Sequence, residues 1–290
     1  MAEAAQADWL AVEWLDGHLS VWAMQGSAVL DSCEGAASVD SLESFIDALS
    51  SLTADLQVPR RLPVFVAGLP VTWSEATPRP VPCDAIAPDT VAVKTESFDL
   101  QIIPGLRQRE PSGLLQGAET RIVGFLSLNK DWDGVICLPG ATSIWAQISA
   151  GEVVSFQSFL TGELIEMLGA EGPAPKDTAL NDTAFDEALS DGLSRPERLA
   201  GRLASLRADR ALGEMPGPTA QARLAGTLIG AELAAARAYW LGQTLAVIGP
   251  EAEASLYMRA LAQQGAPATQ ADAKRMALAG ICAVRRGKAD

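Results

Sequence analysis

The chain has 290 residues, of which 48% are hydrophobic and 20% charged, an ordinary globular balance with room for two domains. Its net charge of -14 opposes binding to the phosphate backbone of nucleic acids and to anionic membranes. Four scattered cysteines without a C-x-x-C pair disfavour a zinc site or a disulfide framework, and the single histidine excludes metal sites built on several histidines.

The first third of the chain predicts three strands, a helix and a fourth strand. Asp16-Gly17 is a strong signal for a two-residue turn between the first two strands. Apolar residues at helical spacing follow, and Asp40 with Glu43 resembles an N-terminal capping pair. The predicted elements are strands at 9–14, 18–24 and 28–32, a helix at 42–56, a strand at 63–68, a Pro-rich loop at 70–88, a strand at 100–103 and a helix at 112–126.

The same order restarts at residue 134. Gly17 precedes Trp22 by five residues, and Gly140 precedes Trp145 by five residues, which we interpret as a weak internal repeat of a three-stranded meander followed by a helix. Chance similarity of two hairpins is the alternative. The predicted elements are strands at 134–138, 142–148 and 152–159, a helix from 161, helices at 185–193, 195–206, 219–239, 255–264 and 271–284, and a short strand at 245–248.

No segment has the features of a membrane anchor or a secretory signal. Residues 1–8 carry two acids and no basic region, and the apolar stretch 224–248 contains Glu232 and Arg237. We therefore expect a cytoplasmic protein with reduced thiols and no membrane contact. We expect two α/β lobes, residues 1–130 and 131–290, with the last helix packing back on the first lobe and a small anionic metabolite bound in the cleft between them.

The tight turns of the two meanders suggest a phosphate clamp. A turn between two strands can aim backbone N–H groups at a phosphate, and small or hydroxyl side chains can assist. The candidates are residues 15–17 in the first lobe and residues 140–143 in the second. Taken alone, each is only a hairpin turn, and that is the simpler interpretation.

Five short motifs resemble, in order and spacing, those of the 2-oxo-3-deoxygalactonate kinases, also called 2-dehydro-3-deoxygalactonokinases. The resemblance covers the chain from Leu10 to about Val284. The motifs are 103–106 (Ile-Pro-Gly-Leu), 117–120 (Gly-Ala-Glu-Thr), 138–145 (Leu-Pro-Gly-Ala-Thr-Ser-Ile-Trp), 159–164 (Phe-Leu-Thr-Gly-Glu-Leu) and 226–232 (Gly-Thr-Leu-Ile-Gly-Ala-Glu).

The resemblance implies the two-lobed α/β fold of actin, hexokinase and the sugar kinases, with an RNase-H-like mixed sheet and helices in each lobe. It also implies transfer of the γ-phosphate of ATP, with Mg²⁺, to the terminal hydroxyl of a six-carbon sugar acid. The residues carried over are Glu119 as the base, Glu13 and Asp16 as Mg²⁺ ligands, Gly17, Gly140, Thr142 and Ser143 at the phosphates, and Gly249 near the adenosine. Small-molecule sugar acid and nucleotide are the expected partners, and the oligomeric state is left open, a homodimer included.

The phosphate loops depart from the family pattern. Leu15 stands where the family has glycine, Asp16 replaces a hydroxyl residue, and Ser20 and Ile144 replace an arginine and a lysine. An uncompensated carboxylate near a triphosphate costs on the order of 1–4 kcal/mol. Two alternatives to the expected kinase follow: a non-catalytic relative that binds a sugar acid as a regulatory or scaffold protein, and a kinase for a different small acid.

Overall fold

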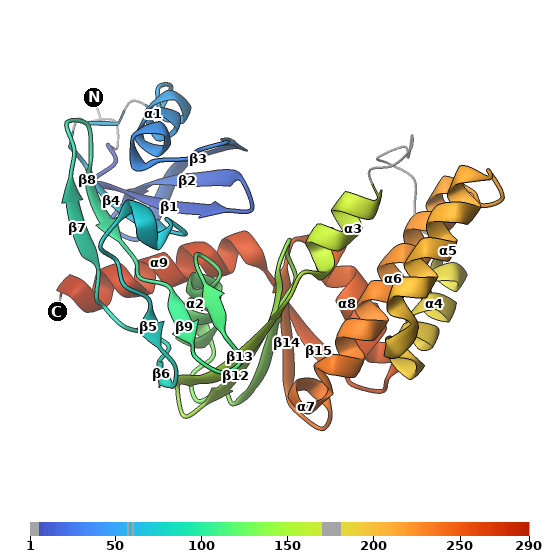
Figure 1. Cartoon of the computed structure of the whole chain (residues 1–290). Coiled ribbons are helices and arrows are strands. Elements are labelled where there is room, and N and C mark those ends of the chain that lie inside the picture. Colours follow the sequence, from blue (N-terminus) through green and yellow to red (C-terminus); the bar gives the residue numbers. More distant parts are fainter. Residues whose placement is uncertain (1–5, 57, 60, 170–180, 290) are drawn as a thin grey trace. The chain divides into compact units, whose positions relative to one another are not determined.

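The computed structural model describes residues 6–56, 58, 59, 61–169 and 181–289, which form two compact units. The first unit contains the chain up to Asp133, the segment Ile148–Ser155 and the chain from Ala271 onward. The second unit contains Gly134–Gln147 and Phe156–Gln270 (Figure 1). No helix among the described residues is both long and apolar enough to cross a membrane.

The first unit is built on a six-stranded sheet in the order β3-β2-β1-β4-β8-β7. β2 runs antiparallel to β1 and β3, whereas β4 runs parallel to β1 and β8. This is the mixed, RNase-H-like arrangement that the family resemblance implies. The strands are β1 (Trp9–Leu15), β2 (His18–Gln25), β3 (Ala28–Ala36), β4 (Pro63–Ala67), β7 (Val91–Lys94) and β8 (Asp99–Ile102).

Alternate residues of β1 pack into two hydrophobic cores on opposite faces of the sheet, because successive side chains of a strand point to opposite faces. Leu10 and Val12 pack with Phe45 of α1 (Leu42–Leu52). Trp9 and Ala11 pack instead with residues of α2 (Glu119–Leu128) and α9 (Ala273–Ala289). Figure 1 shows α9 beside α2, and these two helices cover the second face of the first unit's six-stranded sheet.

Short strands complete the first unit. β5 (Arg79–Pro80), β9 (Leu106–Gln108) and β10 (Gly113–Leu115) form a three-stranded sheet. β6 (Cys83–Asp84) pairs with Glu152 and Val153, which lie in the part of the next hairpin that belongs to this unit.

The second unit repeats the strand order of the first, which confirms the internal repeat. Its sheet has the strand order β15-β14-β11-β12-β13, with β6 paired to β13 at the edge. The strands β11 and β14 are parallel, as are β1 and β4 in the first unit. The strands are β11 (Gly134–Leu138), β12 (Ser143–Ser149), β13 (Glu152–Phe159), β14 (Leu245–Gly249) and β15 (Ala268–Asp272).

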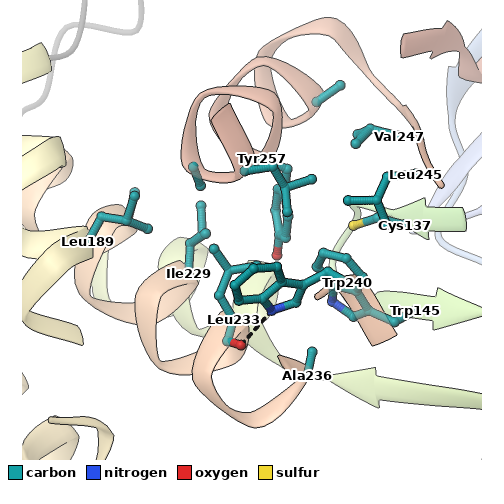
Figure 2. Close-up of a cluster of buried hydrophobic side chains, with 14 of the residues drawn as sticks. Cys137, Trp145, Leu189, Ile229, Leu233, Ala236, Trp240, Leu245, Val247 and Tyr257 are labelled. Carbon is teal, nitrogen blue, oxygen red and sulfur yellow. Dashed lines mark hydrogen bonds between the residues drawn. The ribbon is translucent and has the colours of Figure 1, made fainter. Parts of the chain in front are cut away.

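Helices supply most of the second core. Figure 2 shows Trp145, Trp240 and Tyr257 packed together, with the Trp240 indole donating to the Leu233 carbonyl at 2.7 Å. The helices are α3 (Thr161–Gly169), α4 (Asp182–Ser194), α5 (Leu199–Ala211), α6 (Gly217–Ala235), α7 (Arg237–Trp240) and α8 (Glu251–Gln263), with a 3₁₀ turn at Pro196–Arg198.

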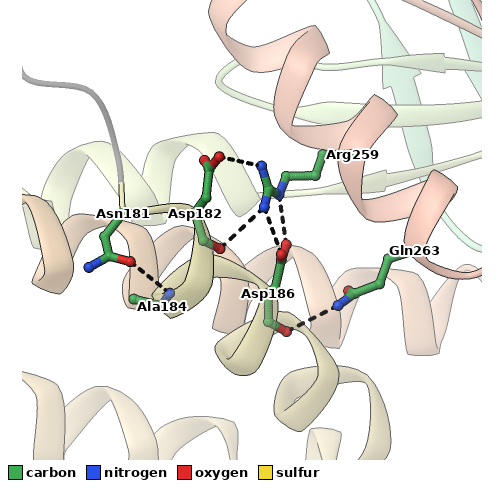
Figure 3. Close-up of polar contacts among 6 residues, drawn as sticks. All are labelled: Asn181, Asp182, Ala184, Asp186, Arg259 and Gln263. Atoms are coloured by element: carbon green, nitrogen blue, oxygen red, sulfur yellow. Dashed lines mark hydrogen bonds and ion pairs between the residues drawn. The ribbon is translucent and has the colours of Figure 1, made fainter.

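An ion pair links α8 to the start of α4. Arg259 contacts the Asp182 carboxylate at 2.8 Å and the Asp186 carboxylate at 2.6 Å (Figure 3). These charge-assisted hydrogen bonds lower the pKa of Asp186. Asn181 caps α4 by accepting from the Ala184 N–H at 3.0 Å.

Some predicted boundaries are wrong. The helix predicted at 112–126 begins only at Glu119, because Gly117 takes a φ of 96° that breaks the helical run. The first helix is capped by Ser41, whose hydroxyl accepts from the Ser44 N–H, one residue later than the predicted pair. The short strands β5, β6, β7, β9, β10 and β15 were not predicted, since they are too short to show alternation.

Candidate functional site

A buried ion pair lies at the end of β1. Arg121 of α2 donates to both carboxylate oxygens of Glu13, with Nε 3.0 Å from Oε1 and Nη2 3.1 Å from Oε2. Glu13 is 4% exposed and Arg121 is 8% exposed. In this paired, side-on geometry the guanidinium neutralises the charge of the Glu13 carboxylate. This arrangement does not fit the predicted role of Glu13 as a Mg²⁺ ligand.

Glu119 is also buried, but it has no such partner. It is the first residue of α2 and is 2% exposed. Neither of its carboxylate oxygens has a hydrogen-bond partner among the described residues. Burial raises its pKa to about 8, the negative charge of Glu13 adds to the rise, and nearby backbone N–H groups and Arg79 oppose it. A buried carboxyl with a pKa near neutrality is suited to proton transfer.

Two glycines let the backbone close around this site. Gly68 follows β4 and lies opposite the end of β1, where an added Cβ would come within 1.8 Å of the Trp14 carbonyl oxygen. An added Cβ on Gly117 would lie 3.2 Å from the Gly68 Cα and 3.3 Å from the Leu15 side chain. The start of α2 therefore packs directly on the carboxyl ends of β1 and β4, where open α/β sheets bind ligands.

The first predicted phosphate turn has the expected conformation. Asp16 and Gly17 both have positive φ, 51° and 73°, and both are exposed. Positive φ at both central residues is the type I′ pattern that Asp-Gly favours. The side chain of Leu15 is only partly exposed and lies near Gly117, where an added Cβ would come within 3.3 Å of it.

The second turn occupies the equivalent place between β11 and β12. Gly140 and Thr142 are partly exposed, whereas Ser143 is fully buried and donates to Glu232 at 2.7 Å. Ile144, at the position of the family's lysine, is buried in β12. The Ser143 hydroxyl thus faces the interior, while Thr142 lies at the partly exposed part of the turn.

Gly249 lies beside this second turn. β11 and β14 are parallel, and their register places Gly249 next to Pro139, where an added Cβ would meet the proline ring at 3.1 Å. Gly68 takes the corresponding position in the first unit, after the strand parallel to β1. Both units thus close the carboxyl ends of their parallel strands with a glycine that allows close backbone contact.

The described residues contain no group of three or more His, Cys, Asp or Glu side chains placed to hold a metal ion. Magnesium at nucleotide sites commonly takes one or two carboxylates and completes its shell with phosphates and water. Asp16 is an exposed carboxylate in the turn between β1 and β2, and its side chain is of the type that Mg²⁺ binds. Both carboxylate oxygens of Glu13 accept from Arg121.

Two units with one shared strand order, each with a turn and a close-packed glycine at the carboxyl ends of its parallel strands, place the chain in the class of two-lobed proteins with the actin, hexokinase and sugar-kinase type of fold. A solved structure with 9% identity and a TM-score of 0.55, component A of (R)-2-hydroxyglutaryl-CoA dehydratase from Acidaminococcus fermentans, shares the fold. Within this class, the chain belongs to the 2-keto-3-deoxy-galactonokinase family, whose sequence model matches residues 13–284.

Relatives over the full length are similar to this chain. A probable 2-dehydro-3-deoxygalactonokinase of Rhizobium meliloti (strain 1021) is 30% identical, with 95% of this chain and 96% of the relative covered. The 2-dehydro-3-deoxygalactonokinase of Escherichia coli (strain K12) is 28% identical, with 98% and 99% covered. A crystal structure of a 2-dehydro-3-deoxygalactonokinase protein from Sinorhizobium meliloti has a TM-score of 0.85, 27% identity and 96% of each chain covered.

Two features of these sites were not found by sequence reasoning. The first is Arg121 as the partner of Glu13, a contact between residues 108 positions apart. The second is Glu232 as the acceptor for Ser143. The sequence showed only that Glu232 is an acid within an apolar helix, which is a signal that it has a buried partner but not which one.

Proposed function

We propose that this protein transfers the γ-phosphate of ATP to the terminal hydroxyl of 2-dehydro-3-deoxy-D-galactonate or of a closely related 2-oxo-3-deoxy sugar acid. The observation that carries the proposal is the family match, which spans both units and extends over nearly the whole chain. The relatives are named as kinases for this sugar acid, and they align with this chain from end to end.

In this proposal Glu119 is the general base. Phosphoryl transfer requires positioning, neutralisation of charge and a group that accepts the proton of the attacking hydroxyl. Glu119 is a carboxyl with no hydrogen-bond partner among the described residues, and its pKa of about 8 makes it a stronger base than an ordinary glutamate once it is ionised. Glu119 is 2% exposed, so a hydroxyl can reach its carboxyl only if the residues around it move.

The remaining predicted residues bind the nucleotide in this proposal. The backbone at Gly17 and Gly140 and the hydroxyl of Thr142 contact phosphates, and Gly249 lies near the adenosine. Asp16 would help to hold a Mg²⁺ ion, and that ion would supply neutralisation of the phosphate charge. Ser143 contributes through its position in the turn, because its hydroxyl is bonded to Glu232.

The departures from the family pattern should weaken nucleotide binding less than the sequence alone indicates. The carboxylate of Glu13 is neutralised by Arg121, so it adds no free negative charge near a triphosphate. The side chain of Leu15 lies near Gly117 and is only partly exposed. These observations favour an active kinase over a non-catalytic relative. A cytoplasmic location rests on the sequence alone and stays a prediction.

Calorimetric titration of the purified chain with ATP in the presence of Mg²⁺ separates the alternatives. Saturable binding at micromolar to low-millimolar affinity supports the kinase, and a panel of sugar acids led by 2-dehydro-3-deoxy-D-galactonate then identifies the acceptor. Sugar-acid binding without ATP binding up to several millimolar would support the non-catalytic alternative instead. Phosphorylation of another acid alone would replace the proposed substrate.

A further inference from the structure

Four neutral donors surround one buried carboxylate in the second unit. Glu232 of α6 is 3% exposed and accepts from Ser143 Oγ at 2.7 Å, from Tyr257 OH at 2.8 Å and from Trp145 Nε1 at 2.8 Å. The hydroxyl of Thr161 also hydrogen-bonds to it. Since an ionised carboxylate offers about four acceptor positions, this donor set saturates it.

These four donors come from three different elements. Trp145 belongs to β12, Thr161 begins α3, and Tyr257 belongs to α8, the helix that follows Gly249. Ser143 is the first residue of β12 and the last residue of the segment 139–143, which contains the turn at 140–143 that is proposed to contact phosphate. One side chain of α6 therefore connects β12, α3 and α8.

The turn is also held directly by the start of α3. The Glu163 N–H donates to the Ala141 carbonyl at 2.8 Å, and Gly162 lies so close that an added Cβ would come within 2.0 Å of the Gly140 carbonyl oxygen. The position of α3 thus sets the position of the turn. Thr161, through its bond to Glu232, fixes that helix at its first residue.

We infer that Glu232 is a positioning residue for nucleotide binding, which holds the turn at 139–143 in the shape that receives phosphate. This inference rests on the proposed kinase function. Glu232 is the last residue of the family motif at 226–232. The inference gives it a role distinct from that of Gly226 and Gly230, which allow α6 to pack closely on α4. Glu232 acts through Ser143 and Thr161 and does not itself touch substrate.

The variant Glu232→Gln in the full chain tests the inference. An amide keeps the size of the side chain but replaces one oxygen with a donor, which cannot accept from a hydroxyl or an indole. We expect the KM for ATP to rise at least tenfold and the KM for the sugar acid to stay within twofold. We also expect amide hydrogen exchange in residues 139–143 to accelerate at least tenfold.

Trp240→Phe is the matched control. It also removes a buried hydrogen bond from α6, the one to the Leu233 carbonyl, but leaves the Glu232 contacts in place. We expect unchanged exchange in residues 139–143 and both KM values within twofold of the wild type. An equal effect of the two variants on ATP and sugar acid would overturn the inference and make Glu232 a core-stabilising residue only.

Ser143→Ala provides a milder variant should Glu232→Gln fail to fold. It removes one donor and leaves three, so it should raise the KM for ATP and accelerate exchange in the turn to a smaller degree. Unchanged exchange there would contradict the inference. If the wild type neither binds ATP nor transfers phosphate, the proposed function and the nucleotide role fail together, while the exchange data still decide whether Glu232 holds the turn.

Discussion

Glu13 and Glu119 are both buried in the first unit, and their surroundings differ. Glu13 meets a guanidinium in paired geometry, whereas Glu119 finds no hydrogen-bond partner among the described residues. The family resemblance implies a functional role for both acids, but only the folded structure determines which groups lie next to each carboxyl. The decisive contact, from Arg121, comes from a distant part of the chain and leaves no local pattern in the sequence.

Removal of Arg121 should destabilise the protein strongly. Arg121→Met leaves the buried Glu13 without a counter-charge, and the free energy of unfolding should fall by about 3–5 kcal/mol. Chemical denaturation measures this change. The double variant Glu13→Gln with Arg121→Met removes both charges and should recover most of the loss. Equal stabilities of the single variant and the wild type would show that the pair is not formed.

Glu119→Gln should remove the base and with it the pH dependence of the rate. We expect kcat to fall by about 10²- to 10⁴-fold. In the wild type, kcat/KM should rise with pH up to about 8, since the free carboxyl must lose its proton to act. Rates measured from pH 6 to 9 test both points, and an unaltered rising limb in the variant would assign the base to another residue.

The same carboxyl should make stability depend on pH. Its pKa is about 8 in the folded protein and about 4.3 in an unfolded chain, so between these values only the folded state holds the proton. The free energy of unfolding should therefore fall as pH rises from about 4.3 to 8, by at most about 1.4 kcal/mol per pH unit. Denaturation at pH 5, 6.5 and 8 should show a flatter dependence for Glu119→Gln. Parallel curves for the two proteins would contradict this account.

Glycines set the helix packing in both units, and the sequence does not reveal which ones. In α2 and α9, an added Cβ on Gly124 or Gly280 would come within 1.9 Å of the facing backbone. In α4 and α6, Gly192, Gly226 and Gly230 make similar close contacts. Gly201 in α5 has nothing within 4 Å. Helical spacing predicted most of the helices, but it cannot distinguish a glycine at a contact from one that faces solvent.

Gly230→Ala and Gly201→Ala should therefore change stability in opposite directions. At Gly230 the new methyl group would lie 2.4 Å from the Leu189 carbonyl oxygen, and forcing the helices apart should cost about 1–3 kcal/mol. At Gly201 the methyl group meets nothing, and the higher helix propensity of alanine should add about 0.5–1 kcal/mol. Thermal unfolding of both variants measures the difference, and equal shifts would contradict the close packing of α4 and α6.

The repeated strand order of the two units is the part of the whole molecule that the sequence predicts best. Long apolar strands and glycine turns carry that signal locally, and the predicted strands of both meanders are confirmed. The sites are less predictable. The turns themselves were correctly placed, but the inward orientation of Ser143 depends on Glu232, which lies 89 residues further along the chain.

The central claim concerns the chemical reaction, and ³¹P NMR of the reaction mixture tests it most directly. The wild-type chain, incubated with ATP, Mg²⁺ and 2-dehydro-3-deoxy-D-galactonate, should produce ADP together with a phosphomonoester resonance coupled to the terminal CH₂ of the sugar acid. Glu119→Gln should form both products at least 100-fold more slowly. ADP formation without the phosphomonoester, or no reaction with an acid that the protein binds, would contradict the proposed function.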